Sequence, residues 1–172
     1  MNAKSMRCML TDTSLFRRIE LQQLMNLTAR ALGKPARRIW TLQNDEALRV
    51  YAEYTRDHLQ GDVEESLLQR MNVEAYKVGR LLRWLFCLRT QADIELFIIA
   101  LYRNIGIRLE GQLPGQLCFR SCFFSQYYTP AICLTASALD EGIIRGLSGG
   151  GRLIFQQRIT EGCKFCLATY TK

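Results

Sequence analysis

The stretch that decides the fold is IRLEGQLPGQLCFRSCFF, residues 107–124. Apolar and polar residues alternate with a period of two on both sides of a segment that contains glycine and proline, residues 111–115. This alternation is typical of strands that cover a core with one face, and the segment between them is typical of a turn. We therefore predict antiparallel strands over about 106–111 and 116–124.

Upstream of this stretch the pattern is helical. Apolar residues recur every three or four positions, as they do in helices that bury one side. The sequence predicts four helices, over about 14–32, 44–61, 62–88 and 91–104. Gly79 falls in the middle of the third helix, and we expect it to let a neighbouring helix approach closely.

Downstream, Thr129 and Pro130 predict the start of one more helix. A hydroxyl side chain caps helix N-termini, and proline is tolerated at the first helical position because its missing N–H needs no partner there. We predict that this helix runs to Leu147 and that strands follow over 152–159 and 164–171. The expected fold class is therefore α+β.

The predicted organisation is a single domain over residues 1–172. A helical N-terminal half, about 14–105, packs with a small antiparallel sheet and one helix in the cysteine-rich C-terminal half, about 106–172. A composition of 48% hydrophobic and 23% charged residues is that of a globular protein. A chain of this length buries a core that needs no cross-links.

Charge and hydropathy narrow the expected location and partners. The apolar runs are shorter than a membrane span, and the first residues lack the apolar stretch of a signal peptide, so we expect a cytoplasmic protein without a membrane partner. The net charge of +7 comes from dispersed basic residues with no RNA-binding or zinc-finger signature. Nucleic acid is therefore not the favoured partner. A small-molecule ligand is expected, and the sequence leaves a homo-oligomer open.

Cysteines are concentrated in the C-terminal half. Of seven, five follow residue 117: Cys118, Cys122, Cys133, Cys163 and Cys166. The odd total and the missing signal peptide argue against a disulfide framework. In a regular strand, Cys118, Arg120 and Cys122 share one face.

The predicted C-terminal helix adds polar residues to the same region. Cys133, Ser137 and Asp140 or Glu141 follow helical spacing beside its apolar stripe. If this polar side faces the sheet, one set of side chains converges: Cys122, Cys133, Cys163 and Cys166 with Asp140 and Arg120.

Three interpretations of these cysteines remain open. Free cysteines pack as small apolar residues, which is the interpretation we prefer for Cys8 and Cys87. Thiolates also bind zinc or iron, and the candidate ligands are Cys122, Cys133, Cys163 and Cys166. A cysteine nucleophile is the third interpretation, and it needs a cation to lower its pKa because the only histidine, His58, lies in a predicted N-terminal helix.

Residues 122–166 resemble the C-terminal part of the L-2-amino-thiazoline-4-carboxylic acid hydrolase-like family. The likeness lies in a strand that bears Cys122, a helix that starts just before Cys133 and carries Asp140, and a strand that leads to Cys166. The stretch is also distantly similar to the cysteine-bearing end of 4-vinyl-reductase-type ligand-binding domains. The resemblance implies hydrolytic opening of a small sulfur heterocycle, or a small-molecule pocket between helices and sheet, with these four residues at the site.

Three functions are compatible with these observations. The first is a small-molecule-binding protein that acts as a hydrolase on a carbon–nitrogen bond of a small amide or sulfur heterocycle. In it Cys122 or Cys166 is the nucleophile, Asp140 activates water, and the substrate is held by Arg120, Cys133 and Arg158. The second is a non-enzymatic metal-binding or ligand-sensing module. The third is an interaction protein with structural cysteines.

Overall fold

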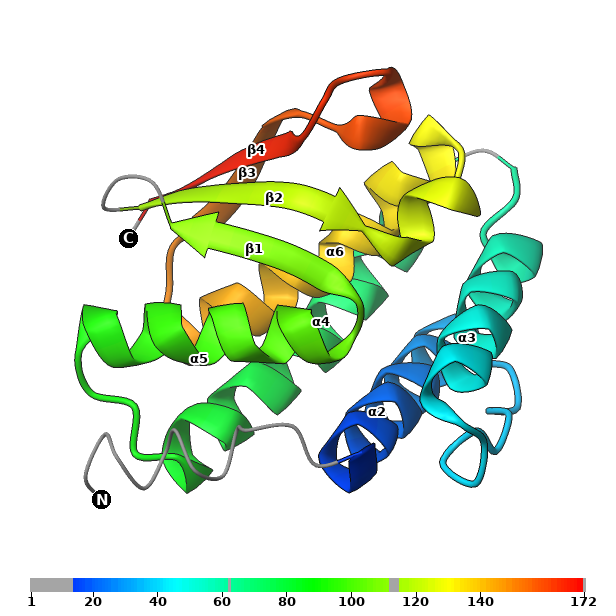
Figure 1. The fold of residues 1–172 in the computed structure, drawn as a ribbon, viewed down its shortest axis with the longest axis horizontal. Coiled ribbons are helices and arrows are strands. Elements are labelled where there is room, and N and C mark those ends of the chain that lie inside the picture. Colours follow the sequence, from blue (N-terminus) through cyan, green and yellow to red (C-terminus); the bar gives the residue numbers. More distant parts are fainter. Residues whose placement is uncertain (1–13, 62, 112–114, 172) are drawn as a thin grey trace.

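The computed structural model describes residues 14–171 except 62 and 112–114 (Figure 1). It confirms the α+β class, with a helical N-terminal half and a four-stranded antiparallel sheet. The helices are α2 (Ser14–Leu32), α3 (Asn44–His58), α4 (Glu65–Leu85), α5 (Gln91–Asn104) and α6 (Pro130–Ser148). The strands are β1 (Ile107–Gly111), β2 (Gln116–Cys122), β3 (Arg152–Gln157) and β4 (Cys166–Thr171).

Two predicted strands end earlier than expected. A 3-10 turn, η1 (Phe123–Gln126), replaces the predicted end of β2, and a second one, η2 (Ile159–Glu161), follows β3. Both turns lie at the end of the sheet that faces the first turn of α6 (Figure 1). They bring several irregular segments together at one place, where the candidate site is found.

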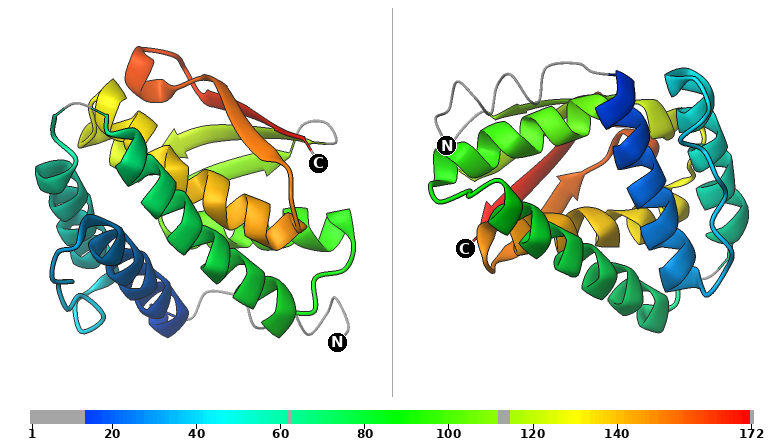
Figure 2. Two further views of the ribbon diagram at one scale, coloured as in Figure 1. Left: turned by 180° about the vertical axis from the view of Figure 1, so that it is seen from behind. Right: turned by 90° about the horizontal axis from the view of Figure 1, so that it is seen from below.

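The strands follow the order β1-β2-β4-β3, and every pair is antiparallel. Helix α5 contacts β1 and α6 contacts β3, so both helices cover one face of the sheet (Figure 1). Helix α4 packs along α6, and α2 packs against α3 and α4 (Figure 2). The core thus lies between the sheet and the helices.

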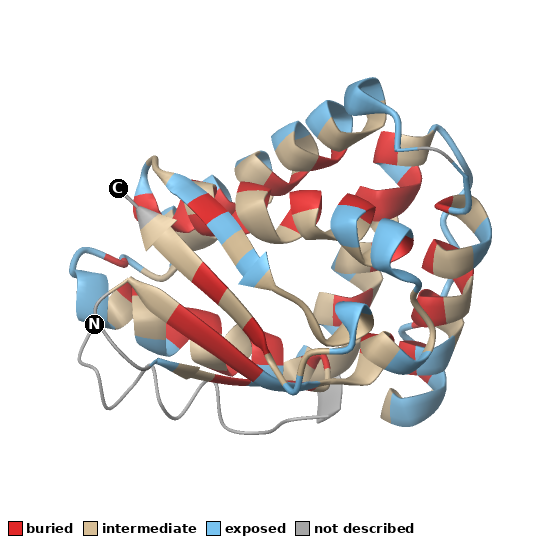
Figure 3. Cartoon of the chain, turned by 90° about the horizontal axis from the view of Figure 1, so that it is seen from above, coloured by how far each residue is buried: buried red, intermediate tan, exposed pale blue. Residues whose placement is uncertain are grey.

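Alternation along the strands explains which face of the sheet is covered. Leu109, Phe119 and Leu153 are buried, whereas Arg108 and Ile154 are exposed (Figure 3). Successive side chains of a strand point to opposite faces, so one apolar set meets the helices and the other set faces outward. The period-two pattern therefore predicted the strands.

Helices α4 and α6 make the closest contact in the molecule, and glycine makes it possible. A Cβ atom added at Gly79 would collide with the carbonyl oxygen of Ile143, and one added at Gly146 would collide with that of Tyr76. Gly142 faces the backbone of α4 in the same way. The expected close approach at Gly79 is confirmed, and its partner is α6.

Candidate functional site: a cavity lined by three cysteines

Three of the C-terminal cysteines meet at a small cavity between the sheet, α6 and α2. Cys122, Cys133 and Cys166 line it together with Asp140. The cavity measures about 80 Å³, which is less than the roughly 150 Å³ that holds a benzene molecule. Most of its remaining wall is apolar or aromatic: Leu24, Tyr51, Ile105, Ile107, Phe124, Ser125, Tyr128, Ala136, Ser137, Leu139, Ile159 and Thr160.

The start of α6 positions two of these residues. Thr129 caps the helix, because its hydroxyl accepts a hydrogen bond from the N–H of Ile132 at 3.3 Å, and Pro130 occupies the first helical position. The predicted cap is therefore confirmed. From this start, Cys133 and Asp140 fall seven residues apart on one side of α6, which is two helical turns.

A β-bulge brings Cys122 to the cavity. Arg108 pairs with Ser121 while Leu109 pairs with Phe119, so one residue of β2, Arg120, is left over between the two pairs. A bulge of this kind shifts the alternation of side chains by one position. Cys122 consequently pairs with Ile107 on the buried side.

The bulge also divides the predicted common face of Cys118, Arg120 and Cys122: Arg120 hydrogen-bonds to Glu110, the cross-strand partner of Cys118, whereas Cys122 lies at the cavity. Arg120 is exposed, donates to Glu110 at 2.8 Å and lies 5.3 Å from the centroid of the Phe165 ring. It does not line the cavity. We therefore place Arg120 outside the candidate site, because regular alternation cannot describe a bulged strand.

The remaining two cysteines of the C-terminal half also lie away from the cavity wall. Cys118 is fully buried within the sheet, and Cys163 lies partly exposed in the turn that follows η2. Cys166, by contrast, is held at the wall, where its Sγ accepts the N–H of Ile159 at 3.2 Å. Across residues 14–61, 63–111 and 115–171, no three or more His, Cys, Asp or Glu side chains cluster closely enough to hold a metal ion.

Asp140 has a partner that the sequence did not reveal. The hydroxyl of Tyr102, on α5, donates to Asp140 Oδ1 at 2.7 Å. The carboxyl group is buried and borders the cavity. Burial raises its pKa to about 6, although the hydrogen bond from Tyr102 and the charge of Arg158 both lower the pKa. A buried tyrosine needs a hydrogen-bond partner, which is the one sequence signal that pointed toward such a pair.

The thiols of the cavity are protonated at neutral pH. Burial raises the pKa of Cys122 to about 12, and burial also raises the pKa of Cys133 and of Cys166. Neutral thiols behave as small, polarizable apolar groups, whereas the thiolate is the nucleophile and the metal ligand. The three cysteines therefore form a soft, uncharged wall around Asp140.

Arg158 lies close enough to influence Asp140 but is not part of the cavity wall. Only 13% of its side chain is exposed, and it contacts Ser137 Oγ at 3.4 Å, Glu161 at 3.6 Å and the face of the Phe155 ring. Its Nε is buried and has no hydrogen-bond partner among the described residues. The positive charge lowers the pKa of Asp140, so Arg158 acts on the site electrostatically without lining the cavity.

A second cavity adjoins the first at Asp140. It measures about 220 Å³ and shares Leu24, Ile105 and Asp140 with the cysteine-lined cavity. Its other wall residues come from α2, α4, α5 and α6 and are predominantly apolar: Phe16, Ile19, Glu20, Gln23, Leu27, Val78, Leu82, Phe86, Phe97, Leu101, Tyr102, Asn104 and Ile143. Asp140 and Tyr102 therefore stand at the junction of a small and a larger cavity.

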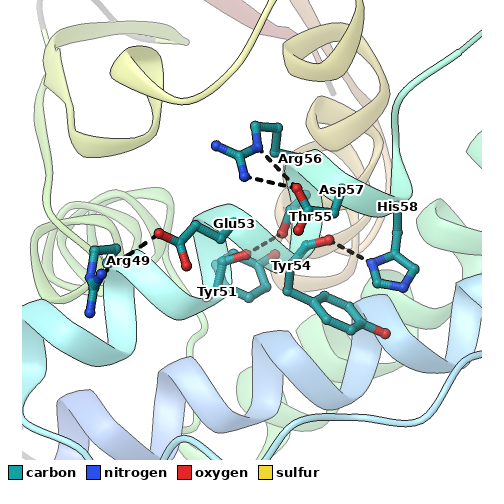
Figure 4. Close-up of polar contacts among 8 residues, drawn as sticks. All are labelled: Arg49, Tyr51, Glu53, Tyr54, Thr55, Arg56, Asp57 and His58. Atoms are coloured by element: carbon teal, nitrogen blue, oxygen red, sulfur yellow. Dashed lines mark hydrogen bonds and ion pairs between the residues drawn. The ribbon is translucent and has the colours of Figure 1, made fainter.

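Histidine takes no part in this site. His58, the only histidine of the chain, ends α3, where its Nδ1 lies 2.9 Å from the carbonyl oxygen of Tyr54 and its ring packs on the Tyr54 ring (Figure 4). Cys87 was expected in the core but is exposed, in a turn after α4 with a positive φ of 50°. The residues on either side of it face the core instead, since Phe86 packs on the Phe97 ring and Leu88 is buried. Cys8 lies outside the described residues.

Comparison with known proteins adds no further constraint. No protein-family model, curated protein or solved structure matches the chain. None of the helices in the described part of the chain combines the length and the hydropathy that a membrane-spanning helix requires. Function must therefore be inferred from the two cavities themselves.

Proposed function

We propose that this protein binds a small, largely apolar molecule in the interior between α2, α4, α5 and α6. The observation that carries the proposal is the 220 Å³ cavity with Asp140 at its inner end. The cavity is partly open, because its wall residues Phe16 and Ile19 are exposed, and a smaller cavity already accommodates benzene. Apolar walls with a few polar groups that orient the ligand are typical of small-molecule sites.

The two cavities have different roles in this proposal. The larger cavity takes the apolar body of the ligand, and the two carboxyl groups of its wall, Asp140 and Glu20, are the groups that can fix its polar end. The cysteine-lined cavity is too small for the whole ligand and receives ordered water or one small substituent. The neutral thiols leave Asp140 as the group with which a polar substituent interacts.

A cavity-filling variant tests the proposal. Leu24 lines both cavities, so Leu24→Phe should fill the space where they meet, whereas Leu134→Phe places the same change on the exposed side of α6. Toluene should raise the melting temperature of the parent protein and of Leu134→Phe, because ligands stabilise the state that binds them, but not that of Leu24→Phe. Circular dichroism would confirm that both variants fold.

Two results would contradict this proposal. Equal stabilisation of Leu24→Phe and of the parent protein would place toluene elsewhere. No stabilisation of any of the three proteins by toluene or indole would remove the cavity as a binding site.

Hydrolysis is a second candidate function, and the environment of Asp140 favours it. A carboxyl group with a pKa of about 6 is ionised at neutral pH and accepts a proton readily. Asp140 would take the proton of an attacking water, and the nearby charge of Arg158 would favour the ionised form of the Asp140 carboxyl group that accepts this proton. The thiols would remain neutral, so the step uses no cysteine nucleophile.

Turnover assays distinguish this second function from binding alone. Carboxylated thiazolines and small amides should be hydrolysed by the parent protein and not by Asp140→Asn, while Glu141→Gln, one residue further along α6, should keep the activity. Hydrolysis that survives Asp140→Asn would exclude Asp140 as the base. Absence of turnover with every compound would leave binding as the function.

A further inference from the structure

The larger cavity differs in charge from the rest of the molecule. The chain carries a net charge of +7, but the described residues that line the cavity include two carboxyl groups, Glu20 and Asp140, and no lysine, arginine or histidine. Every other polar wall residue is an amide or a tyrosine. The cavity therefore combines mostly apolar walls with two acidic groups, one on α2 and one on α6.

Glu20 has one carboxyl oxygen without a partner. Its Oε2 accepts a hydrogen bond from Asn104 Nδ2 at 3.0 Å. Its Oε1 is shielded from solvent and has no hydrogen-bond partner within the described part of the chain. In the carboxylate form this shielded oxygen would be left unpaired, which is costly because it gave up its hydrogen bonds to water. This oxygen is therefore suited to receive a donor from a ligand.

The groups around Glu20 do not fully balance the negative charge that its carboxylate form would carry. Arg17, on the preceding turn of α2, lowers its pKa, but the Arg17 guanidinium is engaged with the carbonyl oxygens of Asn104 and Arg103 on α5. Tyr102 faces Glu20 from α5 and Asp140 lines the same cavity from α6, so neither of these neighbours supplies positive charge.

The fourth neighbouring helix is apolar at this point. Helix α4 contributes only Val78 and Leu82 to the cavity wall, and Phe86 follows directly after the helix. Burial dominates over the partners of Glu20 and raises its pKa to about 8. The unliganded carboxyl group is therefore protonated at neutral pH.

We propose that the cavity binds a small apolar primary amine, whose ammonium group donates to Glu20 Oε1 while its hydrocarbon part packs on the walls from α4 and α5. The inference rests on the proposed function, because it names the ligand class of the same cavity. As the ammonium binds, Glu20 releases its proton to solvent and becomes a carboxylate. A hydrogen bond between two charged groups is stronger than one between neutral groups, which gives an amine an advantage over an alcohol of the same shape.

Three probes of matched shape test this assignment: benzylamine, benzyl alcohol and toluene. Isothermal titration calorimetry at pH 7 should show that benzylamine binds about tenfold tighter than benzyl alcohol, as expected for one hydrogen bond to a charged group. Titration in buffers with different ionisation enthalpies should detect the proton released from Glu20. Glu20→Gln should remove both the amine preference and the proton release, and should keep toluene binding.

Glu65→Gln is the matched control, because Glu65 is exposed and does not line the cavity. This variant should retain the preference for benzylamine. Equal affinity for all three probes in the parent protein would overturn the amine assignment and leave the proposed function intact. An amine preference that persists in Glu20→Gln would overturn the role of Glu20. Failure of every probe to bind would overturn the proposed function together with the inference.

Discussion

Helix α6 takes part in two opposite kinds of packing. Toward α4 it presents Gly142 and Gly146, and the two backbones approach so closely that no methyl group fits between them. Toward α2 and α5 it presents Asp140 and Ile143, and there a 220 Å³ cavity remains. The same helix is thus close-packed on one side and leaves open space on the other.

The difference indicates how the fold keeps a cavity without losing its shape. Close packing lets atoms make many dispersion contacts, and a void forfeits those contacts along its lining. The α4–α6 contact places α6 in one register, so the position of Asp140 does not depend on whether the cavity is filled. We expect stability to be concentrated at the glycine contact and ligand response at the cavity.

The largest effect should come from closing the gap between α4 and α6. Gly142→Leu should lower the free energy of unfolding by about 3 kcal/mol, because the new side chain has to displace the backbone of α4 near Asn72. Chemical denaturation measures this change.

Gly111→Ala provides the control, since among the described residues, chain neighbours aside, no atom lies within 4 Å of a Cβ added at Gly111. It should stay within about 0.5 kcal/mol of the parent protein. A Gly142→Leu variant of parental stability would show that the two helices can separate at little cost, and the contrast between the two sides of α6 would disappear.

The second effect is a dependence of stability on pH, which we expect from the buried carboxyl group of Glu20 beside the larger cavity. The pKa of Glu20 is raised from 4.5 to about 8 in the folded protein, so the folded state holds a proton that the unfolded state loses between these values. The contribution of Glu20 therefore stabilises the protein fully at pH 4, and it declines as the pH rises toward 8, by up to about 1.4 kcal/mol per pH unit.

Denaturation at a series of pH values checks this prediction. Glu20→Gln should flatten the slope between pH 5 and pH 8, although Asp140, with a pKa of about 6, keeps a similar slope below pH 6. A parent protein whose stability rises over the same interval would contradict the burial of these two carboxyl groups.

The smallest effect should arise at the first turn of α6, which carries Cys133 to the cysteine-lined cavity. Thr129→Ala removes the cap on the N–H of Ile132 and should cost about 1 kcal/mol, whereas Thr129→Ser keeps the hydroxyl and most of the stability. Amide hydrogen exchange should accelerate near Cys133 and remain slow from Gly142 to Gly146. Uniform acceleration along α6 would mean that the glycine contact does not hold the helix independently of its cap.

Much of the fold was predictable because its signals are local. The cap at Thr129, the proline that follows it and the alternation in β2 act within a few residues, and the corresponding elements are present. Part of the candidate site was predictable as well, since Cys133 and Asp140 share one side of α6 by helical spacing alone.

Other parts of the site were not predictable from local patterns. The bulge at Arg120 depends on how β1 and β2 pair, so it moved Cys122 to the buried side and left Arg120 outside. Cys87 was assigned to the core by residue type but is exposed, because burial depends on neighbours from the whole chain.

The amino-acid sequence by itself determined the helices and the strands, because capping and hydrophobic periodicity operate over one or two turns. Only the tertiary structure decided which polar groups meet in the interior. Tyr102 reaches Asp140 across 38 residues of sequence, and Asn104 reaches Glu20 across 84. Such pairs form when packing encloses a polar group and the chain must supply a partner. At Glu20 Oε1 the described residues supply none, and this is where we propose that a ligand donates.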